Sequence, residues 1–188
     1  MDSQEKRIYA SKEEVLERLK EIAHNEDSEI DKAEIAHLKT AFYFLLNQER
    51  DEAQKAYLEA GGDPAQYVMT PDETEEVFKA EMNIVKERRQ QAFLKQEAEK
   101  QANLKRKQEI IERIKALTTT PEEAGQAYQE VKKLQEEWKE IKAVPAENAS
   151  ELWNNYKLSL ELFYDLLKMN FEAREYDFKK KLEMKTAL

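Results

Sequence analysis

Apolar residues recur at helical spacing from the first part of the chain onward. Residues 11–24 have an apolar residue every three or four positions, and Ser11 and Glu14 form a capping-box pair that predicts a helix start. A second helix is expected from Asp31, with a centre at the all-round apolar stretch 41–46. The pattern breaks near 47–51, and a further helix is expected to end before Gly61 and Gly62. These helices predict a small acidic helical domain over residues 8–68.

The next segment, residues 70–117, predicts one long connecting helix. Thr70 is the expected cap, Pro71 the first helical residue and Glu73 the capping-box partner. No helix-breaking residue follows until the sequence TTTP at 118–121. A helix of this length cannot be buried along its whole surface in a chain of this size.

Residues 118–188 predict two more helices. Thr120, Pro121 and Glu123 repeat the same start signal, Val144-Pro145 marks the end of that helix, and a last helix is expected from Ala149 or Ser150. Its aromatic residues have helical spacing, which favours a core between the two helices, although an exposed stacking platform for bases or peptides is the alternative. The predicted core residues are Trp138, Leu152, Trp153, Tyr156 and Phe163.

Composition supports an all-α fold and excludes several kinds of chemistry. The 188 residues include 38% charged residues but only three glycines and no cysteine, so there is no thiol catalysis, disulfide or glycine-rich phosphate loop. His24 and His37 lack metal-site spacing and are expected at the surface or at a helix end. No apolar run could span a membrane, and no signal segment is recognisable. We therefore expect a cytoplasmic, non-enzymatic protein without cofactor, small-molecule substrate or membrane contact.

An internal repeat relates two basic stretches. Residues 98–109 (AEKQANLKRKQE) align with residues 172–183 (EAREYDFKKKLE) at an offset of 74, and the basic triplets 105–107 and 179–181 coincide. Leu188 then corresponds to Ile114, which lies within the long helix. Helical repeats stack units whose apolar faces need neighbours. The expectation is a fragment of a longer tandem-repeat protein that stops partway into a second unit.

Residues 134–185 resemble the bacterial family called domain of unknown function 349 (DUF349), and the resemblance extends more loosely back to Pro71. It is carried by a Trp-Lys and Val-Pro stretch, then Leu-Trp, then a Phe-Tyr pair followed by a basic helix. The residues are Trp138, Lys139, Val144, Pro145, Leu152, Trp153, Phe163 and Tyr164. The resemblance implies tandem helical units, and it implies no known activity and no catalytic residues.

Two functions fit these features. The first is a scaffold or adaptor that binds a protein partner or self-associates, for example as a coiled coil along residues 71–117. The second is a protein that binds RNA, ribosomes or DNA through its basic helices. The candidate residues for either contact are the two basic triplets, Lys105, Arg106, Lys107, Lys179, Lys180 and Lys181. The acidic head, with 21 acidic and 10 basic side chains in residues 1–85, opposes indiscriminate binding of nucleic acid.

Overall fold

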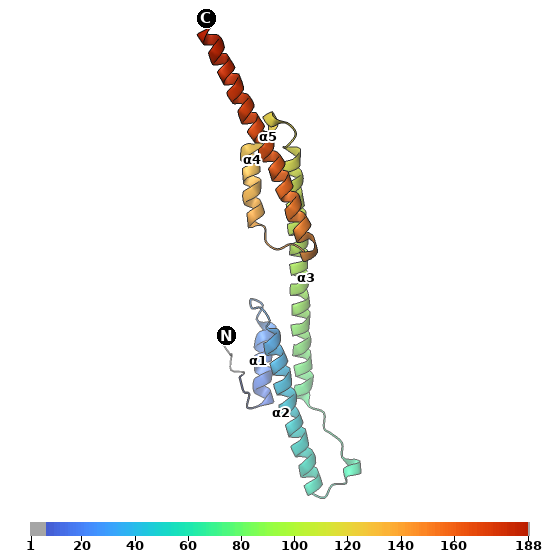
Figure 1. Ribbon diagram of the computed structural model, residues 1–188. Helices are drawn as coiled ribbons and strands as arrows, with labels where there is room; N and C mark the ends of the chain where they lie inside the picture. Colours follow the sequence, from blue (N-terminus) through green and yellow to red (C-terminus); the bar gives the residue numbers. More distant parts are fainter. Residues whose placement is uncertain (1–6, 188) are drawn as a thin grey trace. The chain divides into compact units, whose positions relative to one another are not determined.

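The computed structural model describes residues 7–187, and every regular element in that range is a helix. The predicted all-α fold is therefore confirmed. In chain order the elements are α1 (Lys12–His24), α2 (Lys32–Glu59), the short 3-10 helix η1 (Pro64–Gln66), α3 (Glu73–Ala116), α4 (Pro121–Glu140) and α5 (Ala146–Thr186) (Figure 1). The chain divides into two compact units, the first ending at Phe93 and the second beginning at Leu94.

The boundary between the units falls inside α3, so this helix contributes to two separate cores. Its first half supplies Phe78 and Val85 to the first unit, and its second half supplies Leu104 and Ile110 to the second. The sequence predicts residues 70–117 as a connecting helix between two domains. In the structure the helix is instead part of both.

The core of the first unit forms where α1, α2 and the first half of α3 meet. Phe42 of α2 stacks on Phe78 of α3, with ring centroids 3.9 Å apart and an interplanar angle of 4°. Leu19 of α1 and Leu38 of α2 are fully buried in the same cluster. The apolar stretch 41–46 is only partly central, because Phe44 lies on the outer side of α2 and is 69% exposed.

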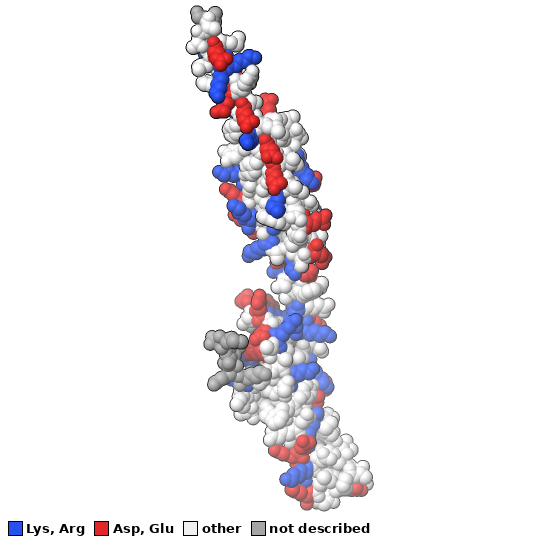
Figure 2. Space-filling view, in the orientation of Figure 1, with Lys and Arg blue, Asp and Glu red and all other residues white. Residues whose placement is uncertain are grey.

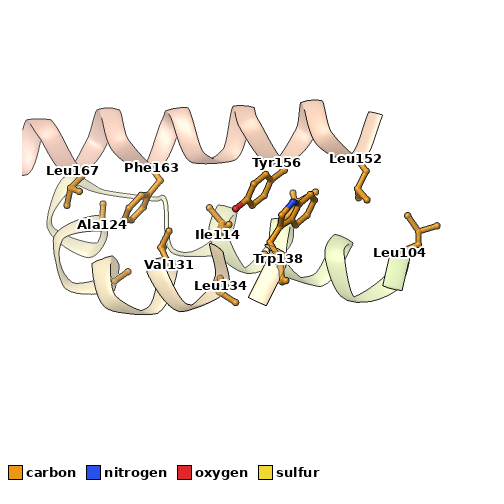
Figure 3. Close-up of a cluster of buried hydrophobic side chains, with 13 residues drawn as sticks. Leu104, Ile114, Ala124, Val131, Leu134, Trp138, Leu152, Tyr156, Phe163 and Leu167 are labelled. Atoms are coloured by element: carbon orange, nitrogen blue, oxygen red, sulfur yellow. The ribbon is translucent and has the colours of Figure 1, made fainter. Parts of the chain in front are cut away.

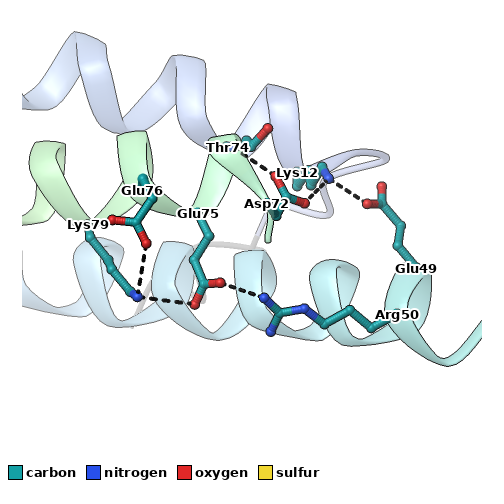
Figure 4. Close-up of polar contacts among 8 residues, drawn as sticks. All are labelled: Lys12, Glu49, Arg50, Asp72, Thr74, Glu75, Glu76 and Lys79. Atoms are coloured by element: carbon teal, nitrogen blue, oxygen red, sulfur yellow. Dashed lines mark hydrogen bonds and ion pairs between the residues drawn. The ribbon is translucent and has the colours of Figure 1, made fainter. Parts of the chain in front are cut away.

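A polar network joins the three segments of the first unit (Figure 4). The Lys12 ammonium donates to Glu49 at 2.5 Å and to Asp72 at 2.6 Å, and Arg50 donates to Glu75 at 2.5 Å. Hydrogen bonding to Asp72 and Glu49 raises the pKa of Lys12, and the same bond to Lys12 lowers the pKa of Asp72. A buried lysine held this way is stable only because carboxylates neutralise it.

Several helix ends follow the capping signals in the sequence. The backbone N–H of Glu14 donates to the Ser11 hydroxyl at 3.3 Å, and that of Glu123 donates to the Thr120 hydroxyl at 3.2 Å. Gly61, at the end of α2, has a φ of +86°, a conformation that glycine adopts without steric cost. These three predictions are confirmed.

Three predicted boundaries are wrong. Residues 47–51 do not interrupt α2, because polar side chains do not break a helix and Arg50 is bound to Glu75. The long helix begins at Glu73, capped by Asp72, whose carboxylate accepts from the backbone N–H of Thr74 at 2.8 Å. The last helix begins at Ala146, directly after Pro145, and no side-chain cap marks this start.

The core of the second unit is formed by the second half of α3, by α4 and by the first half of α5 (Figure 3). Trp138 of α4 stacks on Tyr156 of α5, with centroids 3.8 Å apart and planes inclined by 4°. Burial raises the pKa of Tyr156 to about 12. Gly125 of α4 faces Asn170 of α5, and a Cβ at Gly125 would lie 2.2 Å from the Asn170 amide nitrogen. The absence of a side chain at Gly125 therefore allows α4 and α5 to approach closely at this point.

The first halves of α3 and α5 bury equivalent positions at the repeat offset of 74. Phe78 and Val85 in α3 correspond to Leu152 and Ser159 in α5, and all four side chains are buried in the core of their own unit. Pro71 and Glu73, before and at the start of α3, likewise correspond to Pro145 and Glu147 of α5. The repeat thus relates two helices whose first halves contribute buried side chains to the core of a unit.

Candidate functional site

Neither histidine belongs to a catalytic or metal constellation. His24 Nε2 lies 2.9 Å from a Glu81 carboxylate oxygen, and His37 Nε2 lies 2.7 Å from the backbone carbonyl oxygen of Arg7. Among residues 7–187, no three acidic or histidine side chains are grouped so that they could hold a metal ion. The candidate surfaces are therefore the basic triplets and the exposed apolar side chains.

Four of the five predicted core residues are buried in the second unit. Trp138, Leu152, Tyr156 and Phe163 belong to its cluster, whereas Trp153 is 50% exposed, so the prediction that Trp153 is a core residue is wrong. Adjacent residues of a helix lie about 100° apart. Because Leu152 and Tyr156 face α3 and α4, Trp153 is turned away from the core, and its ring reaches only the edge of Tyr156, at a centroid distance of 5.8 Å.

The first basic triplet, residues 105–107, is largely occupied by contacts within the second unit. The Arg106 guanidinium donates two hydrogen bonds to the Glu137 carboxylate of α4, at 2.5 and 2.8 Å, and a third to Glu109 at 3.2 Å. The bond from Arg106 lowers the pKa of Glu137. Lys107 places its ammonium 4.5 Å from the centroid of the Trp138 ring, and burial lowers the pKa of Lys107. Lys105 is exposed.

The second basic triplet differs in its surroundings. Lys179, Lys180 and Lys181 are all exposed, and within the described range no carboxylate lies within ion-pair distance of them. The structure therefore separates two clusters that the sequence pairs. Side chains of the first triplet connect α3 to α4 through polar contacts, whereas those of the second triplet are exposed to solvent.

A set of large apolar side chains lies along one face of α5 and is only partly covered by the described part of the chain. Successive members are 11, 7, 7 and 4 residues apart, which is close to whole numbers of helical turns, so they share one face. We call this set the α5 stripe. Its members, from 44% to 67% exposed, are Trp153, Tyr164, Phe171, Phe178 and Leu182.

The α5 stripe continues beyond the core of the second unit. Every described residue from Phe171 onward is exposed. Single exposed apolar residues are ordinary on protein surfaces, but several large ones on one helix face are typical of an interaction surface. On the face shown in Figure 2, acidic and basic side chains are interspersed along this segment, with uncharged surface between them.

Sequence reasoning missed the α5 stripe, although the spacing was visible. Residues 153, 164, 171, 178 and 182 have the same helical phase, and the core residues 152, 156 and 163 have another. A helix with two apolar faces uses only one of them to pack in the core of its own unit, and the other remains exposed. The prediction assigned Trp153 to the same core as Leu152, Tyr156 and Phe163.

The comparisons with known proteins identify one family. Residues 73–147 match the family model described as Domain of Unknown Function (DUF349). Comparisons with curated proteins and with solved structures returned no match. Among the described helices, none is long and apolar enough to cross a membrane.

The matched region corrects where the resemblance lies. The family motif in the sequence places its firm part at residues 134–185, but the match covers α3 and α4 and ends at Glu147, before Leu152, Trp153 and Phe163. It begins at the first residue of α3, and the repeat offset of 74 carries Glu73 onto Glu147. In this chain the matched region is thus a long helix plus the shorter helix that packs on its second half. Residues 73–147 of the chain are therefore a DUF349 domain.

Proposed function

We propose that this protein is a cytoplasmic, non-enzymatic scaffold that binds another protein through the α5 stripe. The observation that carries the proposal is the exposure of Phe171, Phe178 and Leu182 on one face of a helix that continues beyond its own core. Aromatic side chains in a row bury a large apolar area when a partner covers them, and such residues dominate the binding energy of protein interfaces. The uncharacterised role of the family is compatible with this proposal.

The charges near the α5 stripe favour a protein partner over a membrane or a bare polyanion. Residues 171–187 carry both signs, since Glu172, Glu175 and Asp177 alternate with Arg174 and the lysine triplet. Mixed charges around an apolar centre are typical of the rim of a protein interface, where they determine orientation and specificity.

In-cell photo-crosslinking tests this proposal. A photoreactive phenylalanine analogue is placed at Phe178, which is 67% exposed, and in a matched control at Phe44 of α2, which is 69% exposed. The expected result is a discrete protein adduct from position 178 that survives nuclease treatment, with no adduct from position 44. Equal adducts from both positions, or adducts that disappear with nuclease, would contradict the proposal.

A second candidate function is the binding of RNA or DNA, and the open lysine triplet is the observation that favours it. Lys179, Lys180 and Lys181 could each neutralise one phosphate and release its counterion, whereas Arg106 and Lys107 are already engaged within the second unit. Three phosphate contacts would give a log–log salt slope of roughly −2 to −3. Replacing all three lysines with glutamate should abolish binding to a labelled RNA, while Lys105→Glu should leave it nearly unchanged.

A further inference from the structure

A further row of large apolar side chains lies along α5, on a different side from the α5 stripe. Its members are 4, 7 and 7 residues apart, so each returns to nearly the same face of the helix. Their side chains are between 53% and 65% exposed. We call this set the outer row, and its members are Leu158, Leu162, Met169 and Tyr176.

The outer row is separate from the other two apolar faces of α5. Three of its members come two residues before a member of the α5 stripe, as Met169 does before Phe171, and two residues turn a helix by roughly 200°. The outer row therefore lies nearly opposite the α5 stripe. Leu162 also precedes Phe163, which is buried in the core roughly 100° further round the helix.

The outer row is not a feature of the internal repeat. At the offset of 74, Met169 corresponds to Lys95 of α3. Leu162 corresponds to Arg88, whose guanidinium donates to the backbone carbonyl oxygen of Ile22 at 2.6 Å. The apolar character of the two central positions therefore belongs to α5 alone, and the repeat does not explain it.

One edge of the outer row carries a line of carboxylates. Each of its members lies three residues after a member of the outer row, which places the line roughly 60° round the helix from that row. We call this line the acidic edge, and its members are Glu161, Asp165 and Glu172. All three are exposed, and no lysine or arginine of residues 7–187 lies within ion-pair distance of them.

The acidic edge distinguishes the two sides of the outer row. Figure 2 shows several acidic side chains in a line along α5. Lys157 and Lys168 lie beyond this line, toward the α5 stripe. On the other side of the outer row, Asn155 and Ala173 are uncharged. The outer row is thus an apolar seam with negative charge along one side only.

We propose that the outer row and the acidic edge bind an amphipathic helix of another protein whose apolar stripe is bordered by lysine or arginine. Apolar residues 4 and 7 positions apart are the spacing with which one helix packs along another. The acidic edge pairs with the cations of the partner helix, since charges beside an apolar seam determine which partner and orientation are accepted. The outer row spans about 27 Å at 1.5 Å per residue, so the partner helix has about five turns.

A second copy of this chain does not have this chemistry. If two α5 helices packed antiparallel through their outer rows, the two acidic edges would face each other and repel. In a parallel pair, the acidic edge would face the uncharged side with Asn155 and Ala173. Nucleic acids and anionic membranes are repelled by the acidic edge for the same reason. The outer row is therefore a second surface, additional to the α5 stripe of the proposed function, with a basic protein helix as its partner.

A designed peptide tests the inference on the full chain. The probe is a fluorescent helix of three heptads with leucine at positions a and d and lysine at positions e and g, and fluorescence anisotropy measures its binding. Leu162→Ser with Met169→Ser should weaken binding at least about tenfold, because both side chains lose apolar contact with the peptide. The matched control is Phe171→Ser with Phe178→Ser on the α5 stripe, which should leave the affinity nearly unchanged. Equal losses in the two variants, or a loss only in the control, would overturn the inference.

A second pair of variants tests the charge. Asp165→Asn with Glu172→Gln should weaken binding and reduce its dependence on salt, because the peptide lysines lose carboxylate partners whose attraction salt would screen. Asp51→Asn with Glu52→Gln removes the same charge from exposed positions of α2 and should have little effect. A peptide with glutamate in place of every lysine should not bind. Binding of both peptides with equal affinity would show that the acidic edge selects nothing, and the inference would be wrong.

Sedimentation of the chain without peptide tests the alternative occupant. A dimer that Leu162→Ser with Met169→Ser converts to a monomer would show that a second copy covers the outer row, which overturns the inference. A chain whose oligomeric state is the same in both forms supports it. Photo-crosslinking at Phe178 reports on the α5 stripe, nearly opposite the outer row, so the proposed function and this inference can fail independently.

Discussion

Replacing Phe163 with alanine tests whether the second unit is held together by the core described above. Phe163 is 0% exposed and points from α5 toward α4 (Figure 3). Removing a buried phenylalanine ring loses its transfer free energy and leaves a cavity, at a cost of about 3–5 kcal/mol. Because domains of this size have a stability of only about 5–15 kcal/mol, this single change should remove a large part of the stability of the second unit.

Tryptophan fluorescence reports this unit alone, because both tryptophans of the chain, Trp138 and Trp153, lie within it. In a Trp153→Phe background the buried, stacked Trp138 becomes the sole reporter. With a urea m value of about 1.5 kcal/mol/M, the expected loss shifts the unfolding midpoint down by roughly 2–3 M. Circular dichroism should show the helices of the first unit unfolding at their original urea concentration.

Phe171→Ala is the matched control, since it makes the same change eight residues further along α5, at a site that is 60% exposed. Its expected effect is within about 0.5 kcal/mol, because surface substitutions away from packed contacts are nearly neutral. If both variants shift the midpoint equally, or if Phe163→Ala shifts it less, the division of α5 into a buried face and the α5 stripe is wrong.

Other predictions concern the polar contacts of each unit. Lys12→Met should destabilise the first unit by about 1–3 kcal/mol in thermal unfolding, since it leaves the Asp72 carboxylate partly buried without its cation. The folded state lowers the pKa of Asp72 below its ordinary value of 3.8, so the unfolded chain binds more protons in acid. The contribution of Asp72 to stability is fully present only well above pH 3.8 and declines as the pH falls through that value, and Lys12→Met should weaken this dependence. Gly125→Ala should destabilise the second unit by about 1 kcal/mol through its clash with Asn170, and in an Asn170→Ala background it should instead stabilise α4 through helix propensity. A destabilising effect of equal size in both backgrounds would rule out the clash.

Local signals in the sequence predicted the helices well, because the residues that start and stop a helix act within one turn. Thr120, Pro121 and Glu123 mark the start of α4, and Gly61 marks the end of α2. The signal failed where the cap came from an unexpected residue. Asp72 caps α3 although Thr70 and Pro71 precede it, and α5 begins directly after Pro145 without any side-chain cap.

The candidate surface could not be read from the sequence with the same certainty. Trp153 and Leu152 are neighbours of similar hydrophobicity, and only the packing of α3 and α4 decides which of them is buried. The two basic triplets also look alike in sequence. Their difference arises from Glu137 and Trp138, which lie about thirty residues from the first triplet and are brought to it by the turn between α3 and α4.

The most direct test of the central claim is an affinity purification of the tagged protein from its own cells, with nuclease added to half of each sample. The wild-type chain is compared with a variant carrying Phe171→Glu and Phe178→Glu, which places charge on the α5 stripe without touching either core. We predict a protein partner that survives nuclease with the wild-type chain and is absent with the variant. Partners that disappear with nuclease, or that remain bound to the variant, would contradict the claim that the α5 stripe is a protein-binding surface.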